Sequence, residues 1–310
     1  MLTNKLIEEL LFIRLCQILI NEEYKAGKFK IPVHLALGHE AIAVAVSNTL
    51  EKQDKLLLTH RNMAYNLART GGRVKSVLHE YYLADSGLAG GRLGSMNLIN
   101  KENNIIYSSS ILANNFSVSA GIAMAEKLRN TQGVTFVLSG DGAIEEGSFY
   151  ESLMLMKSLG LAVVVIIENN EWSLGTHVSE RRTPIDLKQL VASLGIDYCK
   201  LEGNNAASYL ETLKNVRSEV LNTSEPVCVE VILKTLGDRR NPPSEDCPEG
   251  KYINYHAGPS PVVNINNDLH GALLRDNSDD PIYVLGKEVG MDRLSSMVVD
   301  LMQELKSELL

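Results

Sequence analysis

The sequence has no apolar run of membrane-spanning length and no cluster of basic residues. Its longest apolar run is the seven residues 161–167, far short of the roughly 20 residues that a spanning helix needs. The formal net charge is −8, so the chain lacks the basic surface on which nucleic acid is bound. These absences exclude a membrane-spanning helix and argue against nucleic acid as a partner.

The chain also lacks the cysteine spacings of a zinc site. Its cysteines lie far apart in the sequence: Cys16, Cys199, Cys228 and Cys247. They are typical of reduced thiols in a cytosolic protein, and we expect a cytoplasmic location. Residues 3–25 are apolar but are interrupted by Glu8, Glu9 and Arg14, which favours an amphipathic helix over a signal peptide. No internal repeat and no low-complexity tract is present.

At 310 residues the chain can hold one large α/β domain, or one domain followed by a tail. Short runs rich in Val and Ile alternate with segments of helical length. We expect strands at 56–59, 134–138, 161–167, 198–201 and 227–233. We expect helices at 3–25, 38–50, 74–83, 117–128, 149–160, 187–194, 206–221, 269–275 and 293–310. This alternation predicts a parallel sheet with helices on both faces.

The segments between these elements are interpreted as loops. They include a glycine-dense loop at 87–95, a loop at 172–182, and a long polar loop at 237–250. Long loops in compact domains are usually functional or mobile. We expect a domain over residues 1–260 and a helical extension over 261–310.

The most informative segment runs from Gly140-Asp141-Gly142 to Asn170, which lies 29 positions after Asp141. Each end of this segment follows a short apolar run of the kind that forms a buried parallel strand. Asp141 and Asn170 are therefore expected at the carboxyl ends of adjacent strands, where open α/β sheets bind ligands. A carboxylate, an amide oxygen and a nearby backbone carbonyl suit Mg²⁺. Gly140 and Gly142 let the backbone approach a phosphate at the start of a helix. The segment predicts a diphosphate and magnesium site.

The same segment resembles the signature of proteins that bind thiamine diphosphate, which is Gly-Asp-Gly followed some 25 to 30 residues later by Asn-Asn. By itself, Gly-Asp-Gly is also a common turn. Here the flanking strands, the helix between them and the pair Asn169-Asn170 favour the cofactor site.

Residues 5–235 resemble the α subunit of the thiamine-dependent first component of 2-oxoacid dehydrogenase complexes, of the pyruvate, branched-chain or acetoin type. Several ordered segments carry the resemblance: 34–41, with His39 where Gln is usual, 60–64, 90–97, with Asn97 where His is usual, 110–112, 140–147 and 168–176. The resemblance implies the diphosphate-binding domain of that fold, with thiamine diphosphate and Mg²⁺ as cofactors.

The resemblance also implies roles for individual residues. It places Asp141, Asn170 and the backbone oxygen of Trp172 on the metal. It places these residues around the cofactor: His60, Arg61, Ser110, Ile111, Leu112, Gly140, Asp141, Gly142, Ala143, Asn170 and Leu174. His60 and His256 are the candidate catalytic residues. Three of these assignments compete with plainer interpretations, which are a surface ion pair for Arg61, a solvated loop histidine for His60 and a structural turn for His256.

Three departures from the family pattern affect the expected chemistry. Met63 replaces a histidine that the family keeps near the reacting centre, and the histidine-rich loop that meets a lipoyl group is replaced by residues 234–240. Residues 234–286 instead resemble transketolases, in which a Tyr/Trp-His-Gly/Ala turn brings a histidine to cofactor and substrate; His256 holds that place. Lipoyl transfer is therefore expected to be weak or absent.

In this superfamily the carboxylic acid that protonates the aminopyrimidine belongs to a second domain, which this chain is too short to include. The resemblance thus implies a β-type partner in an α2β2 heterotetramer, with no activity for the chain alone. We expect decarboxylation of a 2-oxo acid with transfer of the activated aldehyde. The alternatives are a split transketolase-like or acyloin-forming carboligase acting on a sugar or oxo acid, and a non-catalytic assembly partner.

Overall fold

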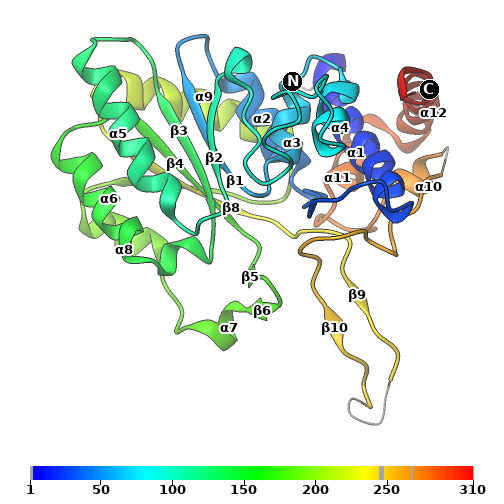
Figure 1. The fold of residues 1–310 in the computed structure, drawn as a ribbon. Coiled ribbons are helices and arrows are strands. Elements are labelled where there is room, and N and C mark those ends of the chain that lie inside the picture. The colour runs from blue at the N-terminus through cyan, green and yellow to red at the C-terminus, as the bar shows by residue number, and fades with distance from the viewer. Residues whose placement is uncertain (1–2, 244–247, 267, 310) are drawn as a thin grey trace.

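A six-stranded, wholly parallel sheet forms the centre of the molecule, as the sequence predicts (Figure 1). The computed structural model describes residues 3–243, 248–266 and 268–309. The strand order is β2-β1-β3-β4-β8-β7. Their bounds are Lys55–Thr59 (β1), Ile105–Ser109 (β2), Thr135–Gly140 (β3), Val163–Asn169 (β4), Asp197–Leu201 (β7) and Val227–Ile232 (β8).

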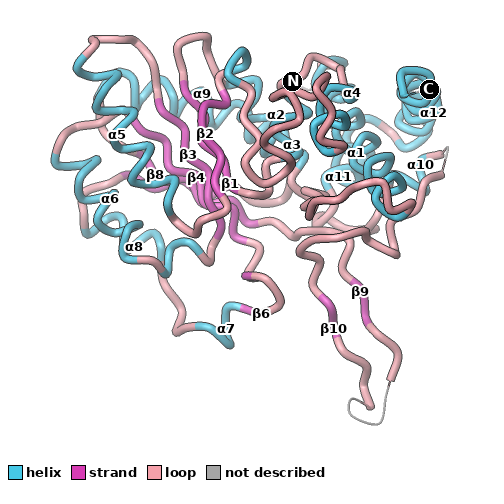
Figure 2. The backbone as a smooth tube through the Cα atoms, in the orientation of Figure 1, coloured by secondary structure: helices cyan, strands magenta, loops and turns pink. Residues whose placement is uncertain are grey.

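Helices cover both faces of this sheet (Figure 2). One layer contains α5 (Asn114–Leu128), α6 (Gly147–Ser158) and α8 (Leu187–Ser193). The other contains α1 (Asn4–Lys25), α2 (Glu40–Thr49) and α9 (Ala206–Thr223), with α3 (Met63–Ala68) and α4 (Val74–Tyr81) beside them. Side chains along each strand alternate between two buried cores: Phe136 and Leu138 face one, and Val137 faces the other. Burial on both faces is what the continuous apolar runs predict.

The strand order reverses beside β1. From β1 the chain crosses to β2 on one side, and β3 then lies on the other side of β1. Such a switch point leaves a crevice at the carboxyl ends of the strands. His60 follows β1 directly, Asp141 follows β3, and Asn170 follows β4. The fold therefore brings these three segments to one edge of the sheet.

Two segments predicted as loops contain short hairpins on that edge (Figure 1). In the first, β5 (Trp172–Ser173) pairs with β6 (Thr176–His177) and leads into α7 (Val178–Arg181). In the second, β9 (Arg239–Arg240) pairs with β10 (Tyr252–Ile253). The prediction of loops at 172–182 and 237–250 was thus partly wrong, because both segments contain short regular elements. Cys247 lies outside the described residues.

The C-terminal segment packs on α1. It consists of α10 (Leu269–Ala272), α11 (Pro281–Val289) and α12 (Met291–Leu309), and its buried side chains Leu294 and Val298 belong to the same core as α1. α1 is not the one-sided amphipathic helix that its sequence predicts, because Arg14 is completely buried among polar partners. The division of the chain at residue 260 stays a prediction.

Apart from the two hairpins and α7, three elements were not predicted from the sequence, namely the six-residue helix α3, the strand β2 and the helix α11. Two 3-10 turns, Lys101–Asn103 and Ala143–Glu145, complete the fold. Within the described part of the chain, no helix combines the length and the apolar character needed to cross a membrane.

Candidate functional site

A cavity of about 360 Å³ opens at the carboxyl ends of β1, β3 and β4. All of the predicted site residues line it: His60, Arg61, Ser110, Ile111, Leu112, Gly140, Asp141, Gly142, Ala143, Asn170, Trp172, Leu174 and His256. These residues come from segments up to 196 positions apart, His60 to His256. The structure thus brings the predicted metal, cofactor and catalytic residues together in one cavity.

Asp141 lies where β3 ends and is almost completely buried. Its Oδ2 accepts a hydrogen bond from Nη2 of Arg181 at 2.5 Å. Burial raises the pKa of the Asp141 carboxyl above its ordinary value, and the ion pair with Arg181 opposes that rise. Glu145 accepts hydrogen bonds from both Arg181 and Arg182, so the 3-10 turn that precedes α6 is held to the end of α7.

Asn170 lies just beyond β4, with both ends of its amide engaged. Its Nδ2 donates to Oγ1 of Thr235 at 2.8 Å, and its Oδ1 accepts the backbone N–H of Trp172 at 2.9 Å. The turn that carries Trp172 begins at Glu171, which has a φ of +66°. These bonds fix the position of Asn170 relative to the β5–β6 hairpin.

Three imidazole rings gather on one side of the cavity. The centroids of His34 and His60 are 4.7 Å apart, those of His34 and His256 5.0 Å, and those of His60 and His256 5.5 Å. Burial, with the charge of Arg61 next, lowers the pKa to about 2 for His34, to about 3 for His60 and to about 4 for His256. All three rings are therefore neutral at neutral pH and can each donate or accept a hydrogen bond.

Arg61 is buried and connects two of these segments. Its Nη1 donates to the carbonyl of Leu35 at 2.5 Å, and its Nη2 donates to the carbonyl of His256 at 3.1 Å. Its guanidinium also lies 6.0 Å from the ring centroid of Tyr255. The side chain is not a surface ion pair, which was the alternative interpretation. Two of its N–H groups hold the backbone that presents His34 and His256.

The open side of the cavity is apolar. Ile111 is 69% exposed, Leu174 is 64% exposed and Leu112 is 49% exposed. Leu174 is held on the rim by its carbonyl, which accepts from Nδ2 of Asn254 at 3.0 Å. Contiguous apolar residues exposed around a ligand cavity mark a surface that another molecule covers.

The sequence analysis missed His34, His39 and Glu168 as cavity residues. His34 and His39 lie in the motif at 34–41, and Glu168 precedes the Asn pair, so each stood within a segment already singled out. Only tertiary structure shows that their side chains face the cavity.

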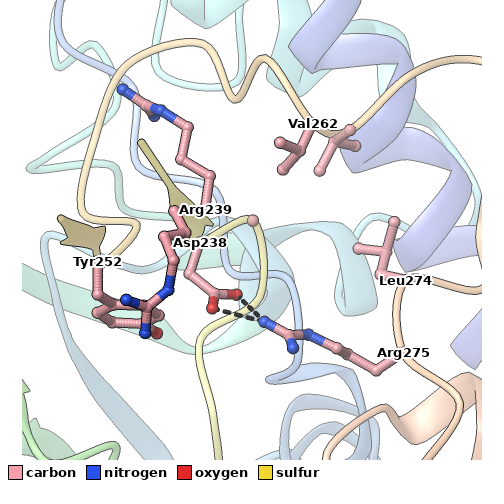
Figure 3. Close-up of a pocket in the computed structure, with 9 residues that line it drawn as sticks. Asp238, Arg239, Tyr252, Val262, Leu274 and Arg275 are labelled. Atoms are coloured by element: carbon pink, nitrogen blue, oxygen red, sulfur yellow. Dashed lines mark hydrogen bonds and ion pairs between the residues drawn. The ribbon is translucent and has the colours of Figure 1, made fainter. Parts of the chain in front are cut away.

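A second pocket, of about 500 Å³, lies beside the β9–β10 hairpin (Figure 3). Its wall combines the apolar side chains Val262 and Leu274 with charged ones. Across it, Arg275 Nη2 pairs with the carboxylate of Asp238 at 2.5 Å. Asp238 is the only carboxylate among the residues that line this pocket, and Arg275 neutralises it.

An open parallel sheet with a buried carboxylate, an amide and glycines at its carboxyl edge defines an α/β protein of the cofactor-binding class. Residues 10–250 match the family model described as the dehydrogenase E1 component. The chain belongs to this family, as its sequence resemblance implies.

Several curated relatives are similar over most of the chain. The pyruvate dehydrogenase E1 component subunit alpha of Rickettsia prowazekii is 32% identical over 227 residues, 73% of this chain and 69% of the relative. The protein of the same name from Rhizobium meliloti is 28% identical, over 74% of this chain and 65% of the relative. The mitochondrial subunit of Saccharomyces cerevisiae is 33% identical over 172 residues, 56% of this chain and 40% of the relative.

Membership of this family implies thiamine diphosphate as the cofactor, and the cavity fits such a group. Nδ1 of His34 is buried beside the cavity without a hydrogen-bond partner, so a polar ligand atom would satisfy it. Gly142 has no space for a side chain, because a Cβ there would lie 2.9 Å from Oγ of Ser173. Glycine therefore lets the backbone at position 142 pack closely against Ser173 in the wall of the cavity.

Proposed function

We propose that this chain is the α-type subunit of a thiamine diphosphate-dependent enzyme that decarboxylates a 2-oxo acid, with pyruvate as the first candidate substrate. The observation that carries the proposal is the position of Asp141 and Asn170 side by side at the carboxyl ends of β3 and β4, within one cavity. The names of the relatives support pyruvate as the substrate and an α-type role.

In this proposal Asp141, Asn170 and the backbone oxygen of Trp172 would hold Mg²⁺, which would offset the negative charge of the diphosphate. Backbone N–H groups at Gly142 and Ala143, at the start of the 3-10 turn that leads to α6, would bind the diphosphate. Ser110, Ile111, Leu112 and Leu174 line the side toward the ring system. When bound, thiamine diphosphate supplies a nucleophilic carbon and an electron sink for the substrate carbonyl.

The substrate then meets the three neutral imidazoles. His60 and His256 can donate N–H hydrogen bonds to the carbonyl oxygen as charge develops on it, because burial keeps both rings neutral at neutral pH and a neutral imidazole carries one ring N–H. Arg61 adds a fixed positive charge behind them, which favours an anionic substrate.

The partner is proposed to be a β-type subunit that covers the apolar rim of the cavity and contributes the carboxylic acid for the aminopyrimidine, in an α2β2 heterotetramer. The exposed rim residues Ile111, Leu112 and Leu174 support a second polypeptide at this position, since burial of such side chains stabilises an interface. The chain alone is then inactive.

A second candidate function is carboligation in the manner of a transketolase. His256 favours it, because this histidine comes from the segment that departs from the dehydrogenase pattern and its ring lies within 5.5 Å of both neighbouring imidazole centroids. A site with three imidazoles offers hydrogen bonds to a hydroxylated acceptor as well as to a carboxylate.

The test is pyruvate decarboxylation and cofactor binding by the complex of this chain with its β-type subunit. We expect turnover with both subunits and none with either alone. Asp141→Ala should weaken Mg²⁺-dependent binding of thiamine diphosphate by an order of magnitude or more, because it removes the only charged ligand. Asp197→Ala, at an exposed aspartate at the start of β7, is the matched control and should bind as the parent does. Unchanged affinity in Asp141→Ala would refute the proposed site.

A further inference from the structure

The amide of Asn170 belongs to a buried hydrogen-bonded chain along the wall of the cavity. Nδ2 of Asn170 donates to Oγ1 of Thr235 at 2.8 Å, and Oγ1 of Thr235 lies 2.9 Å from Nε2 of His39. Thr235 is 6% exposed and His39 is 2% exposed, so water does not compete for these bonds. Thr235 follows β8, and His39 precedes α2. Two separate segments therefore support one amide.

Behind His39 the chain of contacts ends on a buried carboxylate. Nδ1 of His39 lies 3.2 Å from Oε1 of Glu168, although their geometry falls short of a hydrogen bond. The hydroxyl of Tyr65 donates to the same oxygen at 2.5 Å. A carboxylate beside Nδ1 favours the ring proton on that nitrogen, which leaves Nε2 as an acceptor.

This arrangement fixes the direction of each hydrogen bond. The NH₂ group of Asn170 can only donate, so the oxygen of Thr235 accepts from it. The single proton of the Thr235 hydroxyl is then free to point to Nε2 of His39. With its nitrogen held by Thr235, the amide of Asn170 turns its oxygen the opposite way, toward the backbone N–H of Trp172. The amide oxygen is thereby prevented from exchanging places with the nitrogen.

We propose that Thr235 and His39 are positioning residues that hold the amide oxygen of Asn170 toward the divalent cation. The proposal rests on the metal site put forward under the proposed function. A rotated amide would present an NH₂ group to the cation, and groups that orient metal ligands in this way are typically worth 10–100-fold in metal affinity. In this proposal His39 acts through Thr235, and Thr235 acts through Asn170.

The experiment uses the complex of the full chain with its β-type subunit and measures thiamine diphosphate binding by calorimetry across a series of Mg²⁺ concentrations. Thr235→Val keeps the shape of the side chain but removes the hydroxyl, and we expect it to need roughly 10–100-fold more Mg²⁺ for half-maximal binding. Thr235→Ser keeps the hydroxyl and should restore binding close to that of the parent. His39→Leu, which removes the acceptor, should shift the Mg²⁺ requirement in the same direction as Thr235→Val.

A structural role alone would change the melting temperature, whereas a positioning role changes the Mg²⁺ requirement. In Thr235→Val, we expect the KM for Mg²⁺ in turnover to rise while kcat at saturating Mg²⁺ stays near that of the parent. Thr183→Val, at an exposed threonine, is the matched control. The inference is overturned if Thr235→Val and His39→Leu keep the Mg²⁺ requirement of the parent, or if Thr235→Ser is as impaired as Thr235→Val.

Asp141→Ala separates this inference from the proposal beneath it. A normal Mg²⁺ requirement in Asp141→Ala would refute the metal site itself, and the positioning role with it. A raised requirement in Asp141→Ala together with an unchanged one in Thr235→Val would keep the metal site and refute only the positioning role.

Discussion

The buried ion pair between α1 and α11 leads to a prediction about stability. Arg14 is completely buried; its Nε lies 2.6 Å from Oε1 of Glu40, and its Nη2 lies 2.9 Å from Oδ1 of Asp280. Asp280 also accepts the backbone N–H groups of Ile282, at the start of α11, and of Leu274. The change Asp280→Ala therefore removes a charge partner and a helix cap at once.

The expected loss follows from these contacts. Removing one partner of a buried ion pair costs about 3–5 kcal/mol, and the charge of Arg14 then stays buried with Glu40 as its one remaining carboxylate partner. Loss of the cap of α11 adds about 1 kcal/mol. A total of about 4–6 kcal/mol is a large share of the roughly 5–15 kcal/mol that stabilises a typical domain. At roughly 2 °C per kcal/mol for a chain of this size, we expect the melting temperature to fall by about 10 °C.

Scanning calorimetry and denaturant unfolding of the full chain test this prediction. Asp276→Ala, at an exposed aspartate in the same turn region, is the control and should change stability little. If Asp280→Ala lowers the free energy of unfolding by less than about 1 kcal/mol, the pair does not contribute as a buried pair does, and the reasoning fails. Asp280→Ala should also disturb the cavity, because Glu40, the other partner of Arg14, accepts the N–H of Gly38 through Oε2 at 2.8 Å. Gly38 lies in the segment that carries His34 and His39.

Two further predictions concern the imidazoles. Burial lowers the pKa of His34 to about 2, whereas an unfolded histidine titrates near 6.5, so the unfolded chain binds the extra proton as pH falls. The contribution of His34 to the free energy of unfolding is therefore retained above about pH 6.5 and falls below it, by roughly 2 kcal/mol at pH 5. Denaturant unfolding at pH 7 and pH 5 should show a smaller fall for His34→Gln than for the parent. In the His256→Ala complex we expect the rate of C–C bond formation to fall far more than the affinity for the cofactor. For the parent complex we expect weak or absent acylation of a lipoyl domain. Rapid lipoyl acylation by both parent and variant would contradict the second prediction.

The sheet and the centre of the site could be predicted because their signals are local. Each central strand is a continuous apolar run, and the residue that follows it in a parallel sheet must lie at the carboxyl edge. The apolar runs before Asp141 and Asn170 therefore predicted their position at the ends of β3 and β4, whereas their role in binding a metal stays a prediction. The strand β2 was missed because its five residues, Ile105–Ser109, are too short and too polar at one end for the pattern to identify.

The remaining features depend on contacts that no local pattern contains. The burial of Arg14 in α1 requires carboxylates from α2 and from the turn before α11, which is 266 positions further along the chain. The hydrogen bond of Asn170 to Thr235 joins residues 65 positions apart. Polar residues in an apolar helix predict a solvated face unless their partners are known, and only the tertiary structure supplies those partners.

The departures from the family pattern acquire a physical interpretation in the structure. Met63, which replaces a histidine of the family, is 1% exposed and packs in the main core rather than lining the cavity. Histidines at positions 34, 39, 60 and 256 line this cavity instead. The carbonyls of Leu35 and His256 are held by the same buried guanidinium, that of Arg61. A lost histidine at one position therefore does not imply a cavity without imidazoles. The chemistry of the site depends on the side chains that line the cavity. Substitution of His34 and His256 should therefore distinguish dehydrogenase from carboligase activity in this chain.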